Sequence, residues 1–158
     1  MLRVLFVCSA NCARSIMAEA IANQKYGDRI EAASAGTHPT GELHELTLKT
    51  LEDQGLSTEG LASKCWKPMT SRPYDVIVSV CDAAHDEPCP NFIGNPPRVH
   101  WNLPDPPVDE HPEDMFVAVY DALEEAIGLL LFASDRTAVG RGREAARQVA
   151  RRFTPKAA

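Results

Sequence analysis

A cysteine and an arginine separated by five residues stand near the start of the chain, in Val4-Leu5-Phe6-Val7-Cys8-Ser9-Ala10-Asn11-Cys12-Ala13-Arg14-Ser15. The apolar run before Cys8 predicts a buried strand, and the residues from Arg14 onwards predict a helix. A tight loop between a strand and a helix start directs backbone N–H groups towards one point, where the helix dipole also favours negative charge. The segment therefore predicts a cradle for an oxyanion that carries its own nucleophile, the Cys8 thiol.

Several side chains of this loop have a place in such chemistry. Arg14 can hold two oxygens of a tetrahedral oxyanion at once, which a lysine ammonium cannot do. The Ser15 hydroxyl is placed to hydrogen-bond the Cys8 sulfur, and the helix terminus favours a thiolate, so we expect a Cys8 pKa below the reference value of about 8.5. Asn11 tolerates the left-handed backbone that a tight loop needs. The residues expected to bind the oxyanion are Ser9, Ala10, Asn11, Cys12, Ala13 and Arg14.

A candidate proton donor is Asp105, in Pro104-Asp105-Pro106-Pro107. An isolated Asp-Pro pair is typical of a solvated turn. Here the prolines make the segment rigid and a predicted strand precedes it, so the carboxyl could lie over the Cys8 loop and protonate a leaving oxygen.

Two further cysteines, Cys81 and Cys89, flank a segment rich in turn formers. Such a pair could exchange disulfides with the Cys8 thiolate in sequence. Alternatively, Cys81 is a buried residue at a strand end and Cys89 an exposed bystander, or both join His85 as metal ligands. The metal hypothesis lacks a fourth ligand, and prolines flank Cys89, so we expect no metal site.

The two remaining cysteines have less specific surroundings. Cys12 lies inside the loop, where it could form a protective disulfide with Cys8 or simply occupy a small position. Cys65, beside Trp66, is typical of packing.

The elements that would position these residues alternate between strands and helices. Strands are predicted over 2–7, 30–35, 74–80 and 98–101, a short helix within 64–72, and longer helices over 14–26, 42–54, 113–133 and 143–153. Gly140 and Gly142 are expected to break the chain before the last helix. This order predicts an α/β fold, a doubly wound, mostly parallel four-stranded sheet with helices on both faces. Ligands of such folds bind beyond the carboxyl ends of the strands, where Cys8, Cys81 and the turn after Trp101 fall.

Composition narrows the class of protein. With 158 residues, of which 44 % are hydrophobic and 24 % charged, the chain predicts one globular domain over residues 1–158. No apolar segment predicts a membrane span and no signal peptide is evident, so we expect a cytoplasmic protein whose cysteines serve chemistry rather than a disulfide framework. The net charge of −6 argues against nucleic acid as a partner. Seven of the sixteen basic residues lie between Arg136 and Lys156, as a solvated helix face or a partner-binding patch.

Taken together, these segments resemble the arsenate reductases built on the low-molecular-weight protein tyrosine phosphatase scaffold. The resemblance covers the Cys8–Ser15 loop with Ile16-Met17-Ala18-Glu19-Ala20, the Ser34-Ala35-Gly36-Thr37-His38-Pro39 turn, Val80-Cys81-Asp82 through Cys89-Pro90, and His100-Trp101 through Pro104-Asp105-Pro106. It implies that Cys8 attacks arsenate, that Arg14 and the loop amides hold its oxygens, and that Asp105 protonates the departing water. Phosphate or sulfate would occupy the same loop.

The resemblance also implies a thiol relay. Cys81 attacks the Cys8–arsenic adduct, which releases arsenite and leaves a Cys8–Cys81 disulfide. Cys89 then displaces Cys8, and thioredoxin or another thiol-reducing protein reduces the Cys81–Cys89 disulfide, with no tightly bound cofactor. The chain departs from the family pattern at Ala10, where glycine is usual, at Cys12, where serine is common, and in the length of the Cys81–Cys89 segment.

The alternative function is that of a low-molecular-weight protein tyrosine phosphatase, which hydrolyses phosphotyrosine through a phosphocysteine intermediate. A phosphotyrosine pocket needs aromatic walls. In the phosphatase branch tyrosines follow the acid aspartate, whereas here Pro106, Pro107 and Val108 follow Asp105, and only Trp66 is left as a wall. Residual phosphatase activity is still expected, because arsenate and phosphate are near-isosteric and share the first attack. A non-catalytic oxyanion or redox sensor is a third hypothesis.

Overall fold

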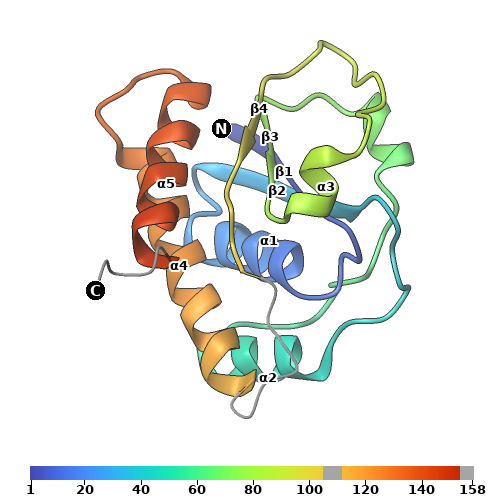
Figure 1. The fold of residues 1–158 in the computed structure, drawn as a ribbon, viewed down its shortest axis with the longest axis vertical. Helices are drawn as coiled ribbons and strands as arrows, with labels where there is room; N and C mark the ends of the chain where they lie inside the picture. The colour runs from blue at the N-terminus through green and yellow to red at the C-terminus, as the bar shows by residue number, and fades with distance from the viewer. Residues whose placement is uncertain (105–111, 154–158) are drawn as a thin grey trace.

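The computed structural model describes residues 1–104 and 112–153. Four strands form one sheet in the order β2-β1-β3-β4, and every described pairing is parallel (Figure 1). The strands are β1 (Leu2–Cys8), β2 (Ile30–Gly36), β3 (Val76–Ser79) and β4 (Arg98–His100). The apolar run Val4–Val7 lies in the inner strand β1 and is fully buried, as expected for a parallel strand covered on both faces. The predicted doubly wound α/β fold is confirmed.

Helices cover both faces of the sheet. The helices α1 (Arg14–Lys25), α4 (Pro112–Phe132) and α5 (Ala138–Phe153) pack side by side, and α1 and α5 also contact the strands. The short helix α3 (Asp82–Asp86) lies on the opposite face. In β4, Val99 contacts α5 at Gly142, whereas the next residue, His100, bonds α3, because successive side chains of a strand point to opposite faces. The remaining elements are α2 (Glu45–Asp53) and the 3₁₀ helix η1 (Lys67–Ser71).

The start of the last helix was predicted wrongly. Helix α5 begins at Ala138 and contains both glycines that were expected to precede it. Gly142 lies in the helix because α5 packs closely on β4, where an added Cβ would lie 2.9 Å from Val99 Cγ2. The helix start is supported instead by Thr137, whose hydroxyl accepts a hydrogen bond from the Gly140 N–H at 3.0 Å.

The short helix α3 was not predicted at all. Its segment is rich in turn formers, and a helix of five residues has little periodicity to detect. Its N-cap is Cys81, whose sulfur accepts a hydrogen bond from the Ala84 N–H at 3.4 Å. The helix thus begins at one of the cysteines that the sequence singled out.

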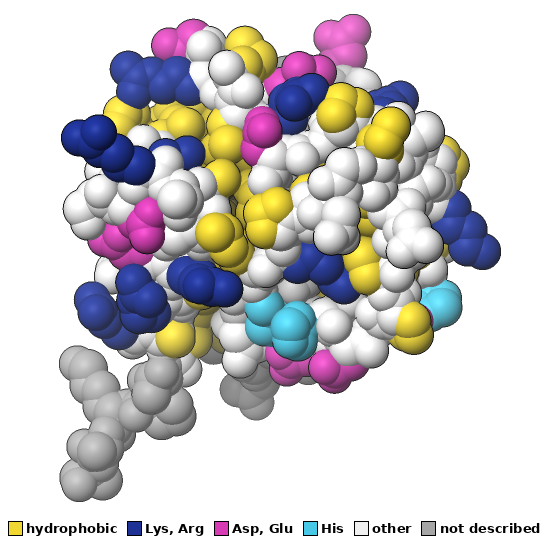
Figure 2. Space-filling view, turned by 90° about the horizontal axis from the view of Figure 1, so that it is seen from above, with side chains coloured by type: hydrophobic (Ala, Val, Ile, Leu, Met, Phe, Trp, Pro, Cys, Tyr) yellow, Lys and Arg dark blue, Asp and Glu magenta, His cyan; other side chains and the backbone are white. Residues whose placement is uncertain are grey.

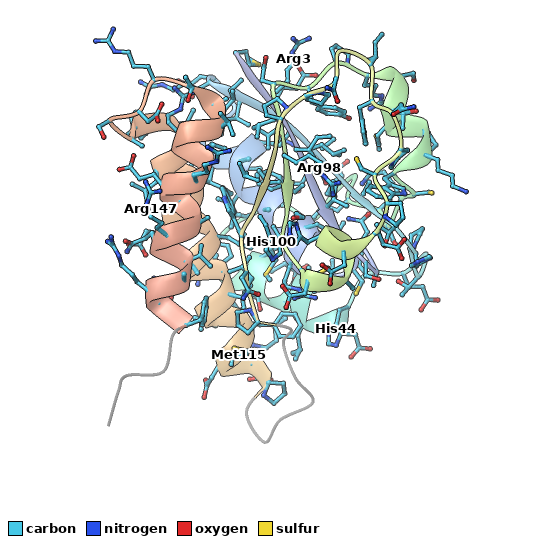
Figure 3. The ribbon with its side chains drawn as sticks, turned by 45° about the horizontal axis from the view of Figure 1, so that its top comes forward. Arg3, His44, Arg98, His100, Met115 and Arg147 are labelled. Atoms are coloured by element: carbon cyan, nitrogen blue, oxygen red, sulfur yellow. The ribbon has the colours of Figure 1, made fainter. Side chains whose placement is uncertain are left out.

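The basic residues of α5 lie largely in solvent. Arg143, Arg147 and Arg151 are exposed, and Arg147 projects away from the sheet (Figure 3). In the space-filling view, basic side chains gather on the side of the molecule where α5 lies (Figure 2). Both the solvated helix face and the partner-binding patch require such exposure, so both interpretations stay open. Within the two described ranges, no helix combines the length and the apolar character needed to cross a membrane.

Candidate active site

The loop that follows β1 is held in place by hydrogen bonds that its carbonyl oxygens accept from surrounding residues. Backbone N–H groups of Thr37, His38, Thr40 and His44 donate to the carbonyls of Cys8, Ser9, Ala10 and Cys12, over 3.1, 2.9, 3.1 and 3.1 Å. Hydroxyls of Ser63 and Thr47 add bonds to the Ala10 and Cys12 carbonyls. The C=O and N–H of a trans peptide point in opposite directions. The N–H groups of the residues that follow these carbonyls are therefore turned inward, as an oxyanion cradle requires.

A cavity of about 550 Å³ opens over this loop. Its walls are the loop itself, the segment 81–83 and the segment 102–104. The ends of β1, β3 and β4 therefore meet at one place, as the predicted topology required. No aromatic side chain is among the described residues that line it.

Cys8 lies at the base of this cavity and is almost completely buried. Its sulfur lies 2.8 Å from Ser15 Oγ, so the predicted hydrogen bond is present, and the Asn11 N–H donates to the sulfur at 3.1 Å. Burial raises the pKa of Cys8, the hydrogen bonds from Ser15 and Asn11 lower it, and the neighbouring Cys81 raises it. The net pKa lies above its ordinary value. The expected lowering was wrong, because burial outweighs the hydrogen bonds.

Asn11 connects the loop to its surroundings. It is fully buried and has a φ of 48°, which confirms the left-handed conformation expected for it. Its amide nitrogen donates to Ser15 Oγ at 2.8 Å and to Ser34 Oγ at 3.1 Å, and its Oδ1 accepts from the Lys64 N–H at 2.7 Å. One side chain thus fixes the Ser15 hydroxyl that contacts the Cys8 sulfur.

A supporting pair of residues, Glu19 and Lys64, lies behind Asn11 and was not predicted from the sequence. Glu19 accepts a hydrogen bond from the Ser34 N–H at 3.0 Å and lies 3.7 Å from Lys64 Nζ. Burial raises the pKa of Glu19, and the Lys64 ammonium opposes that rise. The sequence feature that could have indicated this pair is Ser34, a polar residue inside a short strand of small apolar residues.

Arg14 joins the loop to the segment that leads to Asp105. Its Nη1 donates to the Leu103 carbonyl at 3.1 Å, and both Arg14 and Pro104 line the cavity. Asp105 itself lies outside the described residues, so its role as proton donor stays a prediction.

The structure brings Cys81 to Cys8 but places Cys89 elsewhere. Cys81 is buried, lines the same cavity as Cys8, and accepts a hydrogen bond from the Ser9 N–H at 3.2 Å. Cys89 lines a different cavity, of about 450 Å³, together with Trp66. Cys8 and Cys81 therefore share one cavity, whereas Cys89 lines another.

The other two cysteines, Cys12 and Cys65, lie in different surroundings. Cys12 is half-buried and lines the cavity with Cys8. Cys65 packs against the core and its backbone bridges Gly36, in agreement with the packing role expected for it. Cys8, Cys65, Cys81 and Cys89 are free thiols. His85 stacks on His100, and no group of three or more His, Cys, Asp or Glu residues within 1–104 and 112–153 could hold a metal ion.

Comparison with known proteins agrees with this arrangement. Residues 3–144 match the family described as low molecular weight phosphotyrosine protein phosphatase. An arsenate reductase of Bacillus anthracis is 32 % identical over 124 residues, which cover 78 % of this chain and 90 % of that protein. A glutaredoxin arsenate reductase of Synechocystis is 28 % identical over 131 residues, covering 83 % and 97 % of the two chains.

A solved structure shows the same fold. It is described as an arsenate reductase in the phosphate binding state, is 26 % identical, and superposes with a TM-score of 0.68 over 82 % of this chain and 96 % of the other. The match to the family spans most of the chain, including the Cys8–Arg14 loop and both Cys81 and Cys89. The chain therefore belongs to the low molecular weight phosphotyrosine protein phosphatase family and shares its fold with arsenate reductases.

Proposed function

We propose that this protein reduces arsenate to arsenite, with Cys8 as the nucleophile and Cys81 and Cys89 as successive carriers of the disulfide. The observation that carries the proposal is the position of Cys81, whose sulfur lies at the Ser9 N–H in the cavity that also contains Cys8. A phosphatase needs no second thiol at this point. The proposal also draws on the relatives, which are arsenate reductases.

The first step is substitution at arsenic. The inward N–H groups of the loop and the Arg14 guanidinium hold the oxygens of arsenate. The Cys8 thiolate attacks arsenic, an As–O bond breaks, and Asp105 donates the proton with which that oxygen leaves as water. Ser15 stabilises the sulfur while it is negative, through the hydrogen bond at 2.8 Å.

The second step is the reduction. The Cys81 thiolate attacks the Cys8 sulfur, the S–As bond breaks, and its electron pair remains on arsenic. Arsenic(V) becomes arsenic(III), arsenite leaves, and the two sulfurs are oxidised to a Cys8–Cys81 disulfide. The shared cavity of Cys8 and Cys81 supports this step.

The third step regenerates Cys8. The Cys89 thiolate attacks the Cys81 sulfur, the Cys8–Cys81 bond breaks, and Cys8 leaves as a thiolate. Because Cys89 lines a separate cavity, the segment between the two cysteines has to rearrange first. An external dithiol protein, thioredoxin or a glutaredoxin, then reduces the Cys81–Cys89 disulfide.

The test is an assay of arsenite release with arsenate, thioredoxin, thioredoxin reductase and NADPH, repeated with a glutaredoxin system. We expect Cys8→Ser and Cys81→Ser to abolish turnover, Cys89→Ser to allow a single turnover, and Cys65→Ser, the matched control, to retain wild-type rates. Turnover that survives the combined loss of Cys81 and Cys89 would contradict the relay. Hydrolysis of phosphotyrosine peptides without arsenate turnover would establish the phosphatase instead.

Mass-spectrometric mapping after one turnover without reductant identifies the sulfurs involved. We expect a Cys81–Cys89 disulfide in the wild type and a Cys8–Cys81 disulfide in the Cys89→Ser variant. A Cys8–Cys12 disulfide in either protein would show that the second thiol of the loop diverts the relay.

A further inference from the structure

The segment between Cys81 and Cys89 has two opposing tasks in the proposed relay. It must hold Cys81 against the loop for the first exchange and must release Cys89 for the second. Its helix, α3, has only five residues. A helix this short has little stability of its own, so the contacts at its ends determine where it lies.

The N-terminal end of α3 is tied to the sheet through His100. The Nε2 of His100 donates to Asp82 Oδ1 over 3.0 Å, and its Nδ1 lies 2.8 Å from Ser79 Oγ of β3. The His85 ring stacks on the His100 ring at 4.3 Å with an interplanar angle of 19°. Figure 3 shows His100 beside α3. Since Asp82 directly follows Cys81, these contacts fix the residue that carries the attacking sulfur.

The other end of the helix is tied to the turn after β2. His38 Nε2 and Glu87 Oε1 lie 2.9 Å apart, and Glu87 is two residues from Cys89. The His38 N–H also donates to the Ser9 carbonyl, so this tie connects the Cys89 segment to the outside of the loop. The His38 side chain is 71 % exposed and that of Glu87 is 36 % exposed, so the pair can open at small cost.

We propose that these two histidine–carboxylate pairs act on different steps of the relay. The Asp82–His100 pair positions Cys81 for its attack on the Cys8 sulfur. The His38–Glu87 pair keeps the Cys89 segment in its own cavity and delays the attack of Cys89 on Cys81. The inference rests on the proposed arsenate reduction. All four side chains are assigned as positioning residues, because their described side-chain hydrogen bonds link them to each other and to Ser79 rather than to a cysteine sulfur.

Single-turnover kinetics without reductant separate the two steps. The first exchange is followed as arsenite release in a Cys89→Ser background, and the second as the appearance of the Cys81–Cys89 disulfide in the otherwise intact chain. We expect Asp82→Ala and His100→Ala to slow the first exchange about 5- to 20-fold. Asp82→Asn and His100→Gln, which retain a hydrogen-bonding group, should recover part of that loss.

Substitutions in the His38–Glu87 pair should change the rates of the two exchanges differently. We expect His38→Gln and Glu87→Gln to leave the first exchange unchanged and to accelerate the second about 2- to 5-fold. Lys49→Gln removes a comparable exposed pair with Asp53 in α2 and should change neither step. Glu87→Gln should also raise the rate at which iodoacetamide modifies Cys89 in the reduced protein, a readout that needs no arsenate.

The possible failures are distinguishable. If the wild type forms no Cys81–Cys89 disulfide and the Cys89→Ser variant forms no Cys8–Cys81 disulfide, the proposed function is wrong and the assignment of the pairs fails with it. If the relay operates in the wild type but the two pairs alter both exchanges by the same factor, or neither exchange, the proposed function stands and this inference is overturned.

Discussion

Cys8 is subject to opposing influences that act on a single sulfur. Burial favours the protonated thiol, whereas the Ser15 hydroxyl and the Asn11 N–H favour the thiolate, and Cys81 opposes it. In a buried site, solvent does little to screen these contributions, so each of them shifts the pKa of Cys8. The pH at which Cys8 becomes nucleophilic therefore depends on neighbours that can be removed one at a time.

We expect the thiolate of Cys8 to appear at a higher pH than that of an ordinary thiol, because burial raises its pKa. Ser15→Ala should move the midpoint of Cys8 alkylation further up, since it removes a group that lowers the pKa. Cys81→Ser should move the midpoint down, since it removes a group that raises it. The measurement is the pH dependence of iodoacetamide modification, resolved by mass spectrometry.

The matched control for these two variants is Ser63→Ala, which removes a hydroxyl from the Ala10 carbonyl without touching sulfur. Its midpoint should equal that of the wild type. A shift of the Ser15→Ala and Cys81→Ser variants in the same direction would contradict the balance described for Cys8.

At the scale of single residues, the sequence predicts which residues form the candidate site better than it predicts the pKa values of their side chains. Cys8, Arg14 and Ser15 are close in the chain, so their spacing was enough to place them around one loop. The raised pKa of Cys8 could not be predicted, because it depends on burial by residues that are distant in sequence. The same holds for Lys64, which reaches Asn11 from 53 residues away.

At the scale of elements, β2 and the loop after β1 approach each other closely at Gly36. A Cβ added to Gly36 would lie 2.6 Å from the Ser9 carbonyl oxygen and 2.9 Å from Asn11 Cβ. Both atoms belong to a loop that is tied on its outer side, so it cannot yield without losing its shape. The turn that follows β2 provides those ties, so β2 and the loop are positioned together.

We expect Gly36→Ala to destabilise the protein by about 1–3 kcal/mol and to weaken phosphate binding at least about 10-fold, because the loop has to shift. Urea unfolding and isothermal titration with phosphate measure the two effects. Gly128→Ala is the matched control, since its new Cβ would meet only the Tyr26 hydroxyl at 3.4 Å. Alanine in that helix should be neutral or stabilise by up to about 1 kcal/mol. Equal losses in both variants would argue against the close approach of β2.

The elements that could be predicted are those whose pattern is local. The apolar run of β1 and the helical periodicity of α1 identified both elements to within one residue of their ends. Helix α3 escaped prediction because its ends are fixed by His100 and His38, residues that belong to other elements. The start of α5 was misplaced because neither glycine breaks the helix: Gly142 reflects packing on β4, and Gly140 lies close to the Asp135 side chain.

Across the whole molecule, one buried hydrogen bond connects α5 to the end of the sheet. Trp101 Nε1 donates to the Gly142 carbonyl at 2.9 Å, between residues 41 apart in the chain. The Trp101 ring is fully buried and lies 5.8 Å from that of Phe6. Trp101 also precedes the segment 102–104 that lines the cavity, so the same residue joins the core to the site.

We expect Trp101→Phe to lower stability by about 1–3 kcal/mol, because the Gly142 carbonyl loses its partner in a buried place and a smaller ring leaves space. For a domain of this size the melting temperature should fall by roughly 3–10 °C. Trp66→Phe is the control: no hydrogen bond from its ring nitrogen is among those described, so its effect should be smaller. Calorimetry that ranked the two variants in the opposite order would contradict this role of Trp101.

The alternation of strands and helices was enough to predict the sheet and the edge at which the site lies. It could not reveal the bond between Trp101 and Gly142, since no local pattern marks a contact between a strand end and a later helix. The convergence of Cys8 and Cys81 followed from topology alone, because Cys8 ends β1 and Cys81 lies just beyond the end of β3, its parallel neighbour.

The hydrogen bonds to the carbonyls of the loop after β1 have a consequence for selectivity between phosphate and arsenate. A loop held at four carbonyls has little freedom to adapt its shape to one oxyanion. Under the proposed function, we therefore expect it to bind both phosphate and arsenate, which are near-isosteric. Selection between the two is then kinetic and occurs after binding. Arsenic(V) accepts the electron pair of the S–As bond, whereas phosphorus(V) in the same position can only be hydrolysed or released. Under the proposed function, we therefore expect phosphate to compete with arsenate for the loop without consuming reductant.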